Sequence, residues 1–288
     1  MIFNVTGGGG GTGGALTVTA PANVTVTVSK DGKTKTKNSD TSGVVVFKGL
    51  ETGTWTITIS NGTDTATKTV EIKADYQTEI TFFSATINIT YPAGLACTAT
   101  NGSTTLNAPD TSGTWACVVP NAGTWTVSLS NGLSETVTIA ATGESHAVNK
   151  WYLLKNGVAN QTYKFGEGQI RDGNLVTVTN GDGALVCTSP RSQTVGIATA
   201  IAVNLAGFTK IVVEYNGNKA IYFGGYAALQ GAWDSPKKYT FGVTTSTTSG
   251  TAEAAVPEDV PELYVGVGWS TNNNGGATIN ISNLWLEV

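Results

Sequence analysis

The sequence contains few charged residues and very little histidine or cysteine. Charged residues make up 12% of the 288 residues, about half of the share usual in soluble domains. With a single His, His146, and three Cys, the chain lacks the ligands for a Cys/His zinc cluster in any recognisable spacing. Lys and Arg number 16 against 20 Asp and Glu, and the net charge of −4 is not the basic excess of a nucleic-acid-binding protein. We therefore expect no metal, no cofactor and no nucleic-acid partner.

Long apolar runs are missing as well. No segment approaches the roughly 20 apolar residues that a membrane helix needs, so we expect no membrane partner. The N-terminus runs from Met1 to Thr6 into a glycine-rich stretch ending at Gly14, and it has neither the basic nor the apolar part of a secretory signal. The chain as written is expected to be made in a cytoplasm, although its composition is typical of extracellular proteins. Release by lysis within a particle, or earlier removal of a leader, would each resolve this conflict.

The residues that are abundant favour strands and turns. Glycine occurs 36 times and hydrophobic residues make up 40% of the chain, enough to build cores, while threonine and valine favour strands over helices. A segment beginning Gly53-Thr54-Trp55-Thr56 returns 70 residues later as Gly123-Thr124-Trp125-Thr126. The same offset relates Asp40-Thr41-Ser42-Gly43 to Asp110-Thr111-Ser112-Gly113. Two matches at one spacing indicate a tandem duplication.

Each repeated unit has the pattern of a small β-sandwich. Val24, Val26 and Val28 alternate with polar residues, the period of a half-buried strand. Asp31-Gly32 is typical of a hairpin turn. Turn signals every 8–12 residues in a unit of about 70 predict an immunoglobulin-like sandwich.

Two tryptophans and two cysteines occupy core-type positions in the repeats. Trp55 and Trp125 share one position in a strand, and we expect them to pack between the sheets rather than to stack on a ligand. An offset of 71 near the start of the second unit places Cys97 at the position of Val26, and Cys117 replaces Phe47. The two cysteines either form a disulfide across the core or remain reduced as small buried hydrophobes.

The repeat stops near Gly143-Glu144-Ser145-His146, and a third region follows. We predict an all-β protein with a glycine-rich arm at 1–15, two immunoglobulin-like β-sandwiches at 16–85 and 86–147, and a larger jelly-roll-like β-sandwich at 148–288. Apolar strands are predicted in this third region at Thr209–Val213, Ala220–Phe223, Leu263–Trp269 and Thr278–Leu286.

Two motifs carry a resemblance to known families. The ending Ile-Ser-Asn-Leu-Trp-Leu-Glu at 281–287, which follows a glycine-rich turn, resembles the last strand of jelly-roll modules that bind carbohydrate or decorate phage tails. The Gly-Thr-Trp-Thr repeat resembles the short immunoglobulin-like and PEGA-like domains of phage virion proteins, and the glycine-rich opening is similar to the start of prophage tail proteins. The resemblance implies a structural protein of a bacteriophage tail or virion, present in many copies, or a bacterial surface protein.

The third region contains two kinds of candidate functional residue, carboxylates and aromatic rings. A hydrolase would need two carboxylates flanking a sugar, and the acids there lie mostly in expected loops: Glu167, Asp172, Asp182, Glu214, Asp234, Glu253, Glu258, Asp259, Glu262 and Glu287. Aromatic rings give a better indication, because sugar-binding sites use them against pyranose faces. The aromatic pool is Tyr215, Tyr222, Phe223, Tyr226, Trp233, Tyr239 and Trp269. We predict a glycan platform formed by Trp233, Tyr226, Asp234, Gln230 and Arg171.

These observations favour a protein without catalytic residues. The first hypothesis is a virion structural, decoration or tail-fibre protein, whose tandem sandwiches act as a spacer and whose terminal sandwich serves assembly with other virion subunits or attachment to host-surface glycans. It predicts a homo-oligomer or many copies on one particle. The alternative is a carbohydrate-binding adhesin or accessory module of a bacterial cell-wall enzyme, located extracellularly or at the cell surface. A hydrolase with carboxylates in the third region is the remaining hypothesis.

Overall fold

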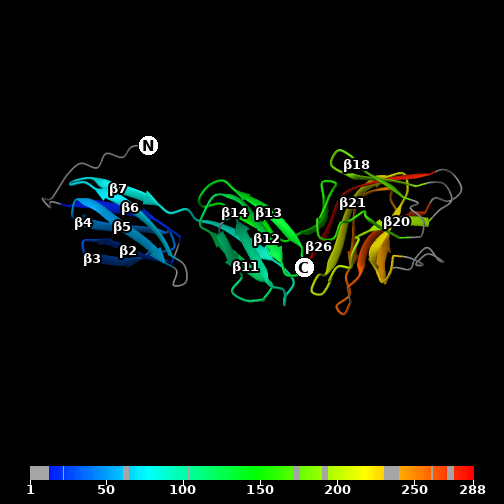
Figure 1. The fold of residues 1–288 in the computed structure, drawn as a ribbon, viewed down its shortest axis with the longest axis horizontal. Coiled ribbons are helices and arrows are strands. Elements are labelled where there is room, and N and C mark those ends of the chain that lie inside the picture. Colours follow the sequence, from blue (N-terminus) through cyan, green and yellow to red (C-terminus); the bar gives the residue numbers. More distant parts are fainter. Residues whose placement is uncertain are drawn as a thin grey trace. The chain divides into compact units, whose positions relative to one another are not determined.

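The computed structural model of the protein describes residues 13–21, 23–60, 65–102, 104–170, 176–189, 194–229, 240–260, 262–270 and 276–288. All regular elements in these residues are β-strands (Figure 1). The described residues contain no helix with the length and apolar character that a membrane crossing requires. The prediction of an all-β protein built from several sheets is confirmed.

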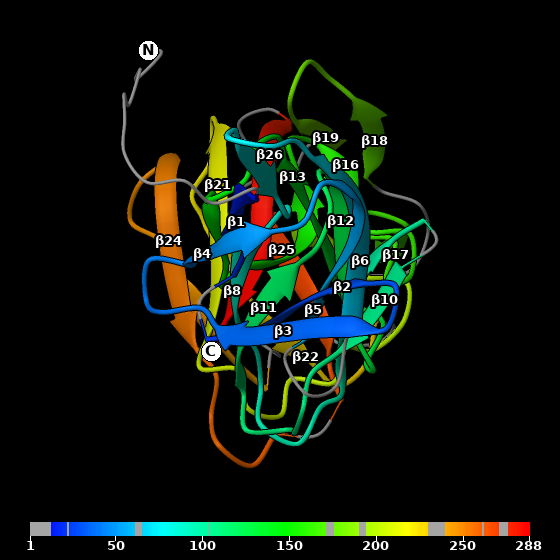
Figure 2. The same cartoon turned by 90° about the vertical axis from the view of Figure 1, so that its left-hand side faces the viewer.

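The first sequence repeat forms two facing sheets. One sheet has the order β4-β1-β7, with β1 antiparallel to β4 and parallel to β7. The other has the order β3-β2-β5-β6 and is antiparallel throughout. Figures 1 and 2 show the two layers. The strands are β1 (Gly14–Thr19), β2 (Thr25–Lys30), β3 (Lys33–Asn38), β4 (Val44–Leu50), β5 (Gly53–Ser60), β6 (Thr65–Ile72) and β7 (Gln77–Thr81).

Alternation along the strands builds the core of this sandwich. In β5, Trp55, Ile57 and Ile59 are buried while the threonines between them face outward, as successive side chains of a strand must. The turn between β2 and β3 places Asp31 at φ 50° and Gly32 at φ 79°, the left-handed conformation that a tight two-residue hairpin needs. Strand β3 differs from the others because all six of its residues are exposed.

The second repeat has the same strand order as the first. Its sheets are β11-β8-β14, with β8 parallel to β14, and β10-β9-β12-β13. In both repeats the carboxylate of an aspartate, Asp40 or Asp110, accepts a hydrogen bond of 2.8 Å from the backbone N–H two residues later. The strands are β8 (Ala85–Thr90), β9 (Cys97–Asn101), β10 (Thr104–Asn107), β11 (Thr114–Val119), β12 (Gly123–Leu129), β13 (Ser134–Ile139) and β14 (Ser145–Val148).

The C-terminal region forms two larger antiparallel sheets. In the first, the long strand β26 pairs with β21 on one side and with β15 and β19 on the other. Strand β24 extends this sheet beyond β21, and β16 and β18 pair with β15 and β19. The second sheet has the order β17-β20-β25-β22-β23. The first sheet contains β15 (Trp151–Lys155), β16 (Val158–Ala159), β18 (Thr177–Asn180), β19 (Leu185–Ser189), β21 (Lys210–Gly217), β24 (Ser249–Ala255) and β26 (Ala277–Glu287). The second contains β17 (Gly168–Gln169), β20 (Thr194–Ala198), β22 (Ile221–Tyr226), β23 (Phe241–Thr244) and β25 (Tyr264–Ser270).

The sheets fall into three groups that share no strand among the described residues. The chain itself divides into two compact units. The first unit runs through Ala85 and includes 118–122 and 140–144, and the second comprises 86–117, 123–139 and 145–288. Most of the second repeat therefore belongs to the same unit as the C-terminal sandwich. The division into three domains at the boundaries given above stays a prediction.

Candidate functional site

A polar hollow lies on the outer face of the sheet that contains β26. Its volume is about 600 Å³. Adjacent strands supply its floor: in the pairing register, Asn280 of β26 lies opposite Val186 of β19 on one side and opposite Asn216 of β21 on the other. Side chains of directly opposed residues on one face are about 5 Å apart. The amides of Asn216 and Asn280 therefore lie next to each other on the floor of the hollow.

A β-bulge in β26 shapes the second row of the hollow. The register between β21 and β26 shifts between Glu214 and Tyr215, so that Ser282 is the extra residue. Asn283 Nδ2 donates a hydrogen bond of 2.6 Å to Glu214 Oε2, and Ser282 Oγ donates one of 3.2 Å to the backbone oxygen of Glu214. Bulges bend a strand locally and re-aim its side chains. Here the bulge holds the Glu214 carboxylate in place beside the two asparagines.

The rim of the hollow is a hairpin turn between β18 and β19. Gly181 N–H donates to Ala184 O at 2.8 Å, and Gly183 has φ 68°. Between them Asp182 is exposed at the tip of the turn and lines the hollow. Thr251 of β24, opposite Glu214, lines the other side. Amide, carboxylate and hydroxyl groups thus converge on one depression.

These groups suit the recognition of hydroxyl-rich ligands. Amides both donate and accept hydrogen bonds, and carboxylates accept them, so the set can satisfy several sugar hydroxyls at once. Within the described part of the chain, no group of three or more His, Cys, Asp or Glu side chains is placed to hold a metal ion. The hollow does contain two carboxylates, Asp182 and Glu214, so the hydrolase hypothesis passes the geometric condition of having two acids in one cleft.

The structure does not assemble the predicted glycan platform among its described residues. Trp233, Asp234, Gln230 and Arg171 lie outside those residues, so their part of the prediction stays open. Tyr226 is described, and its side chain is 0% exposed and packs with Ile170 and Ala198. Tyr226 therefore does not belong to an exposed platform, which corrects that part of the prediction.

Glycines in the neighbouring strand explain why the aromatic residues of this sheet are buried. A Cβ on Gly268 would lie 2.3 Å from Tyr222 Cε2, and one on Gly266 would lie 2.9 Å from Tyr226 Cε2. The tyrosine rings therefore cover strand positions that have no side chain. Burial raises the pKa of Tyr222 above its usual range, and its hydroxyl donates to Trp269 O at 2.9 Å. These rings contribute to packing rather than to a binding surface.

The tryptophans and cysteines of the repeats lie in the cores. Trp55 and Trp125 are 2% and 0% exposed, and Trp55 Nε1 donates to Glu51 O at 2.8 Å. Cys97 and Cys117 are both buried, as the offset alignment predicts, and they are free thiols in this structure. The structure thus contains the reduced alternative and not the disulfide.

Sequence reasoning missed Asn216 and Asn280 as candidate binding residues. Sixty-four positions separate them, and the register of β21 with β26 brings them together. Asp182 and Glu214 were in the pool of acids, but nothing in the sequence paired them. The one available signal was the alternation at the start of β26, in which Asn280 lies between the buried Ile279 and Ile281 and Ser282 follows Ile281.

Comparison with known proteins reveals only distant likeness. No protein-family model and no curated protein matches the chain. A mutant of a family 29 carbohydrate-binding module has 13% identity and a TM-score of 0.34, over 48% of this chain and 89% of that one. A structure of carbohydrate-binding modules from the β-sandwich superfamily has 13% identity and a TM-score of 0.30, over 71% and 98%. The Bacillus anthracis TIE protein has 12% identity and a TM-score of 0.23, over 92% and 49%. Likeness at this level carries no inference about function.

Proposed function

We propose that the C-terminal sandwich is a carbohydrate-binding module and that the hollow around Asn216 and Asn280 is its binding site. The observation that supports this proposal is the convergence of two amides, a fixed carboxylate and a hydroxyl on one sheet face. Strand pairing sets the positions of these residues, and Asn283 holds the Glu214 carboxylate before any ligand arrives. Preorganisation of this kind reduces the entropy lost on binding.

We favour binding over catalysis because of the position of Asp182. A general acid or base must be held within a fraction of an ångström of its productive position. Asp182 is exposed at the tip of a turn between two glycines, the most permissive backbone residues, whereas Glu214 is held by Asn283. The pair therefore combines one carboxylate held by a hydrogen bond and one exposed carboxylate on a turn flanked by glycines, which suits hydrogen bonding to hydroxyls better than glycoside cleavage.

The test is a glycan-array screen of the whole chain, followed by calorimetric titration of the best neutral ligand. The double variant Asn216→Ala/Asn280→Ala removes two to four hydrogen bonds, so we expect an affinity at least about tenfold lower. The matched control is Thr188→Ala, on the same face of β19 but outside the lining of the hollow, and it should bind as the parent chain does.

Two results would contradict this assignment. If the double variant binds the glycan as tightly as the parent chain does, the binding site lies outside the hollow. In that case Trp233→Ala tests the predicted aromatic platform directly, because loss of binding there would favour Trp233 over the hollow. Release of reducing sugar from the bound glycan, abolished by Glu214→Gln, would favour the hydrolase hypothesis instead.

A structural role in a virion is a second proposal for the same chain. The observation that favours it is the pair of sandwiches with one topology, in a charge-poor chain. Such repeats can serve as a spacer that carries a binding module away from a particle or a cell surface. Mass spectrometry of purified particles tests the proposal, and absence of the chain from them would remove it.

A further inference from the structure

The first repeat carries a row of lysines along its outermost strand. Lys33, Lys35 and Lys37 alternate along β3, and Lys30 precedes them across the turn. We call these four residues the lysine row. They make up a quarter of the 16 lysines and arginines of the chain, within eight residues. All of β3 is exposed and Lys30 is partly exposed, so the row is accessible to a ligand.

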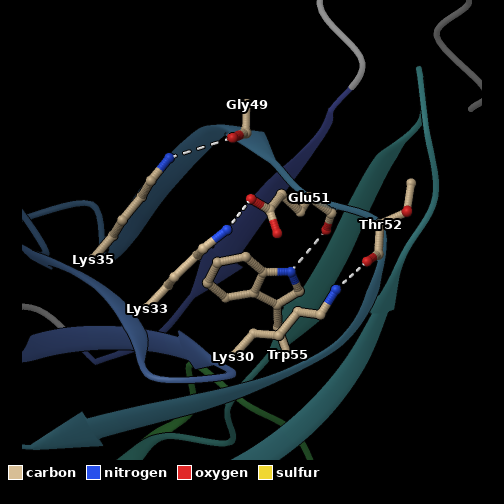
Figure 3. Close-up of polar contacts among 7 residues, drawn as sticks. All are labelled: Lys30, Lys33, Lys35, Gly49, Glu51, Thr52 and Trp55. Atoms are coloured by element: carbon tan, nitrogen blue, oxygen red, sulfur yellow. Dashed lines mark hydrogen bonds and ion pairs between the residues drawn. The ribbon is translucent and has the colours of Figure 1, made fainter.

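The lysine row is held in place by the neighbouring edge of the other sheet. Lys37 Nζ donates to Val46 O at 2.6 Å, and Lys35 Nζ donates to Lys48 O at 3.2 Å. Lys30 Nζ donates to Thr52 O, and Lys33 forms an ion pair with Glu51. Figure 3 shows Lys30, Lys33 and Lys35 reaching toward the segment from Gly49 to Thr52. Each ammonium group is therefore directed by a contact at its tip.

These contacts order the ammonium groups without neutralising most of their charge. A carbonyl takes one of the three donors of an ammonium and leaves its charge unchanged. Among the described residues, Glu51 is the one acid that forms an ion pair with the row. The hydrogen bond from Lys33 and the charges of Lys33, Lys30 and Lys35 lower the pKa of Glu51. The row thus already stabilises one carboxylate, and it retains two donors on most of its ammonium groups.

The geometry of the row is that of a linear charged surface. Alternate residues of a strand are about 6.7 Å apart, so the ammonium groups of Lys33, Lys35 and Lys37 originate at regular intervals. Free lysine side chains lose rotamer freedom when a ligand orders them. The carbonyl contacts have already imposed much of that order.

The second repeat shows that the fold does not require these lysines. By strand pairing, Thr104, Leu106 and Ala108 take the places of Lys33, Lys35 and Lys37. That sandwich has the same strand order without a cation at any of the three positions. The row therefore occurs in the first repeat alone. A feature that the fold does not require is expected where residues serve binding.

We propose that the lysine row binds a linear anionic polysaccharide, one that carries a carboxylate or a phosphodiester on successive units. This site is separate from the hollow and does not depend on the function proposed for it. A polysaccharide is favoured over a nucleic acid because β3 contains only Lys, Thr and Asn. It therefore offers no ring on which bases could stack.

The experiment measures binding of the whole chain to polygalacturonate and to poly(N-acetylmannosamine phosphate), with dextran and a single-stranded DNA oligonucleotide alongside. At low ionic strength we expect binding to at least one of the two anionic polymers and none to dextran. Because polyanion binding releases counterions, Lys35→Gln/Lys37→Gln should weaken binding and make its salt dependence shallower. The two polymers distinguish a carboxylate ligand from a phosphate ligand.

Three further variants separate binding from a structural effect. Lys35→Arg/Lys37→Arg keeps both charges and should retain binding. Glu51→Gln frees Lys33 from its carboxylate and should strengthen binding. Lys73→Gln removes an exposed lysine of the same repeat outside the row, and it should bind within about twofold of the parent chain, since distant surface changes have small effects.

Several outcomes would overturn the proposal. They are no binding to either polymer, equal losses in Lys73→Gln and Lys35→Gln/Lys37→Gln, or tighter binding to the oligonucleotide than to both polymers. The hollow is tested separately, because Asn216→Ala/Asn280→Ala should bind the anionic polymers as the parent chain does. If Asn216→Ala/Asn280→Ala loses glycan binding, it should still bind the anionic polymers. Likewise, if Lys35→Gln/Lys37→Gln loses polymer binding, it should still bind the glycan.

Discussion

At the scale of single residues, burial changes the chemistry of the three cysteines. Burial raises the pKa of Cys97, Cys117 and Cys187 to about 12 each. Because the thiolate is the reactive form, only about one thiol in ten thousand is ionised at pH 8. These cysteines act as small apolar side chains in the fold.

The first prediction follows from this burial. The native chain should not react with a thiol-specific disulfide reagent at pH 8, and the chain unfolded in denaturant without reductant should titrate three thiols. A count of one thiol after unfolding would instead show that Cys97 and Cys117 are bridged. The Cys187→Ala variant makes the count unambiguous. Its unfolded chain should titrate two thiols if Cys97 and Cys117 are reduced and none if they are bridged.

The core positions of residues could be predicted, but their environments could not. Alignment of the repeats placed Cys97 and Cys117 on core-facing positions, and both are buried. Tyr226 is buried although the sequence places it in the predicted glycan platform. The sequence does not show that Gly266 lies beside it in the neighbouring strand. A ring is buried or exposed according to its partner across the sheet, and that partner is distant in sequence.

At the scale of elements, the two turns preceding β4 and β11 show how closely the repeats correspond. Gly43 and Gly113 have φ 73° and 93°, and each accepts a hydrogen bond of 2.9 Å at its carbonyl from the end of the first strand of its sandwich. A Cβ on Gly43 would lie 2.1 Å from Ala20 O, and one on Gly113 would lie 2.8 Å from Tyr91 O. Only glycine fits either position.

The second prediction compares two glycines of the first repeat. Gly32 also has a positive φ, but its Cβ would meet nothing within 4 Å. Gly32→Ala should therefore lower the free energy of unfolding by about 1–2 kcal/mol through backbone strain alone. Gly43→Ala adds a clash with Ala20 O and should cost more. Urea unfolding of both variants measures the two losses of unfolding free energy. Equal losses would contradict the clash of a Gly43 Cβ with Ala20 O.

Strand prediction succeeded where apolar residues mark a strand and failed where the strand has none. The predicted apolar strands at Thr209–Val213 and Leu263–Trp269 correspond to β21 and β25. Strand β3 had no apolar signal, because it lies at a sheet edge with both faces exposed. The hollow could not be predicted either, since it depends on a register containing a bulge at Ser282.

At the scale of the whole molecule, the second repeat and the C-terminal sandwich are joined by specific polar contacts within one compact unit. Trp151 Nε1 donates to Thr90 O at 2.9 Å. Lys155 Nζ lies 2.5 Å from Glu135 Oε2, and Glu135 is 7% exposed. By strand pairing, Glu135 takes the place of Lys68 in the first repeat. One position thus carries opposite charges in the two repeats, and in the second it is used to join two sandwiches.

The third prediction concerns the pH dependence of this junction. Burial raises the pKa of Glu135 despite the hydrogen bond and charge of Lys155. The folded chain therefore holds the Glu135 proton more tightly than the unfolded chain does. Stability contributed by the protonated form is present below the unfolded pKa of about 4.3 and is lost as pH rises through the folded pKa.

Glu135→Gln removes this titration. The free energy of unfolding of the parent chain, minus that of the variant, should fall as pH rises above about 4.3, by no more than about 1.4 kcal/mol per pH unit. Denaturant unfolding at a series of pH values measures the difference. A difference that grows with pH would mean that the pairing with Lys155 outweighs burial.

The parallel pairing of the first and last strands in each repeat has a mechanical consequence. Strand β1 pairs with β7 over five residue pairs, and β8 pairs with β14 over four. Tension on the two ends of a repeat pulls such strands past each other in opposite directions, so their hydrogen bonds must break together rather than one after another. Each repeat is therefore built to resist stretching, and the first should withstand the greater pulling force.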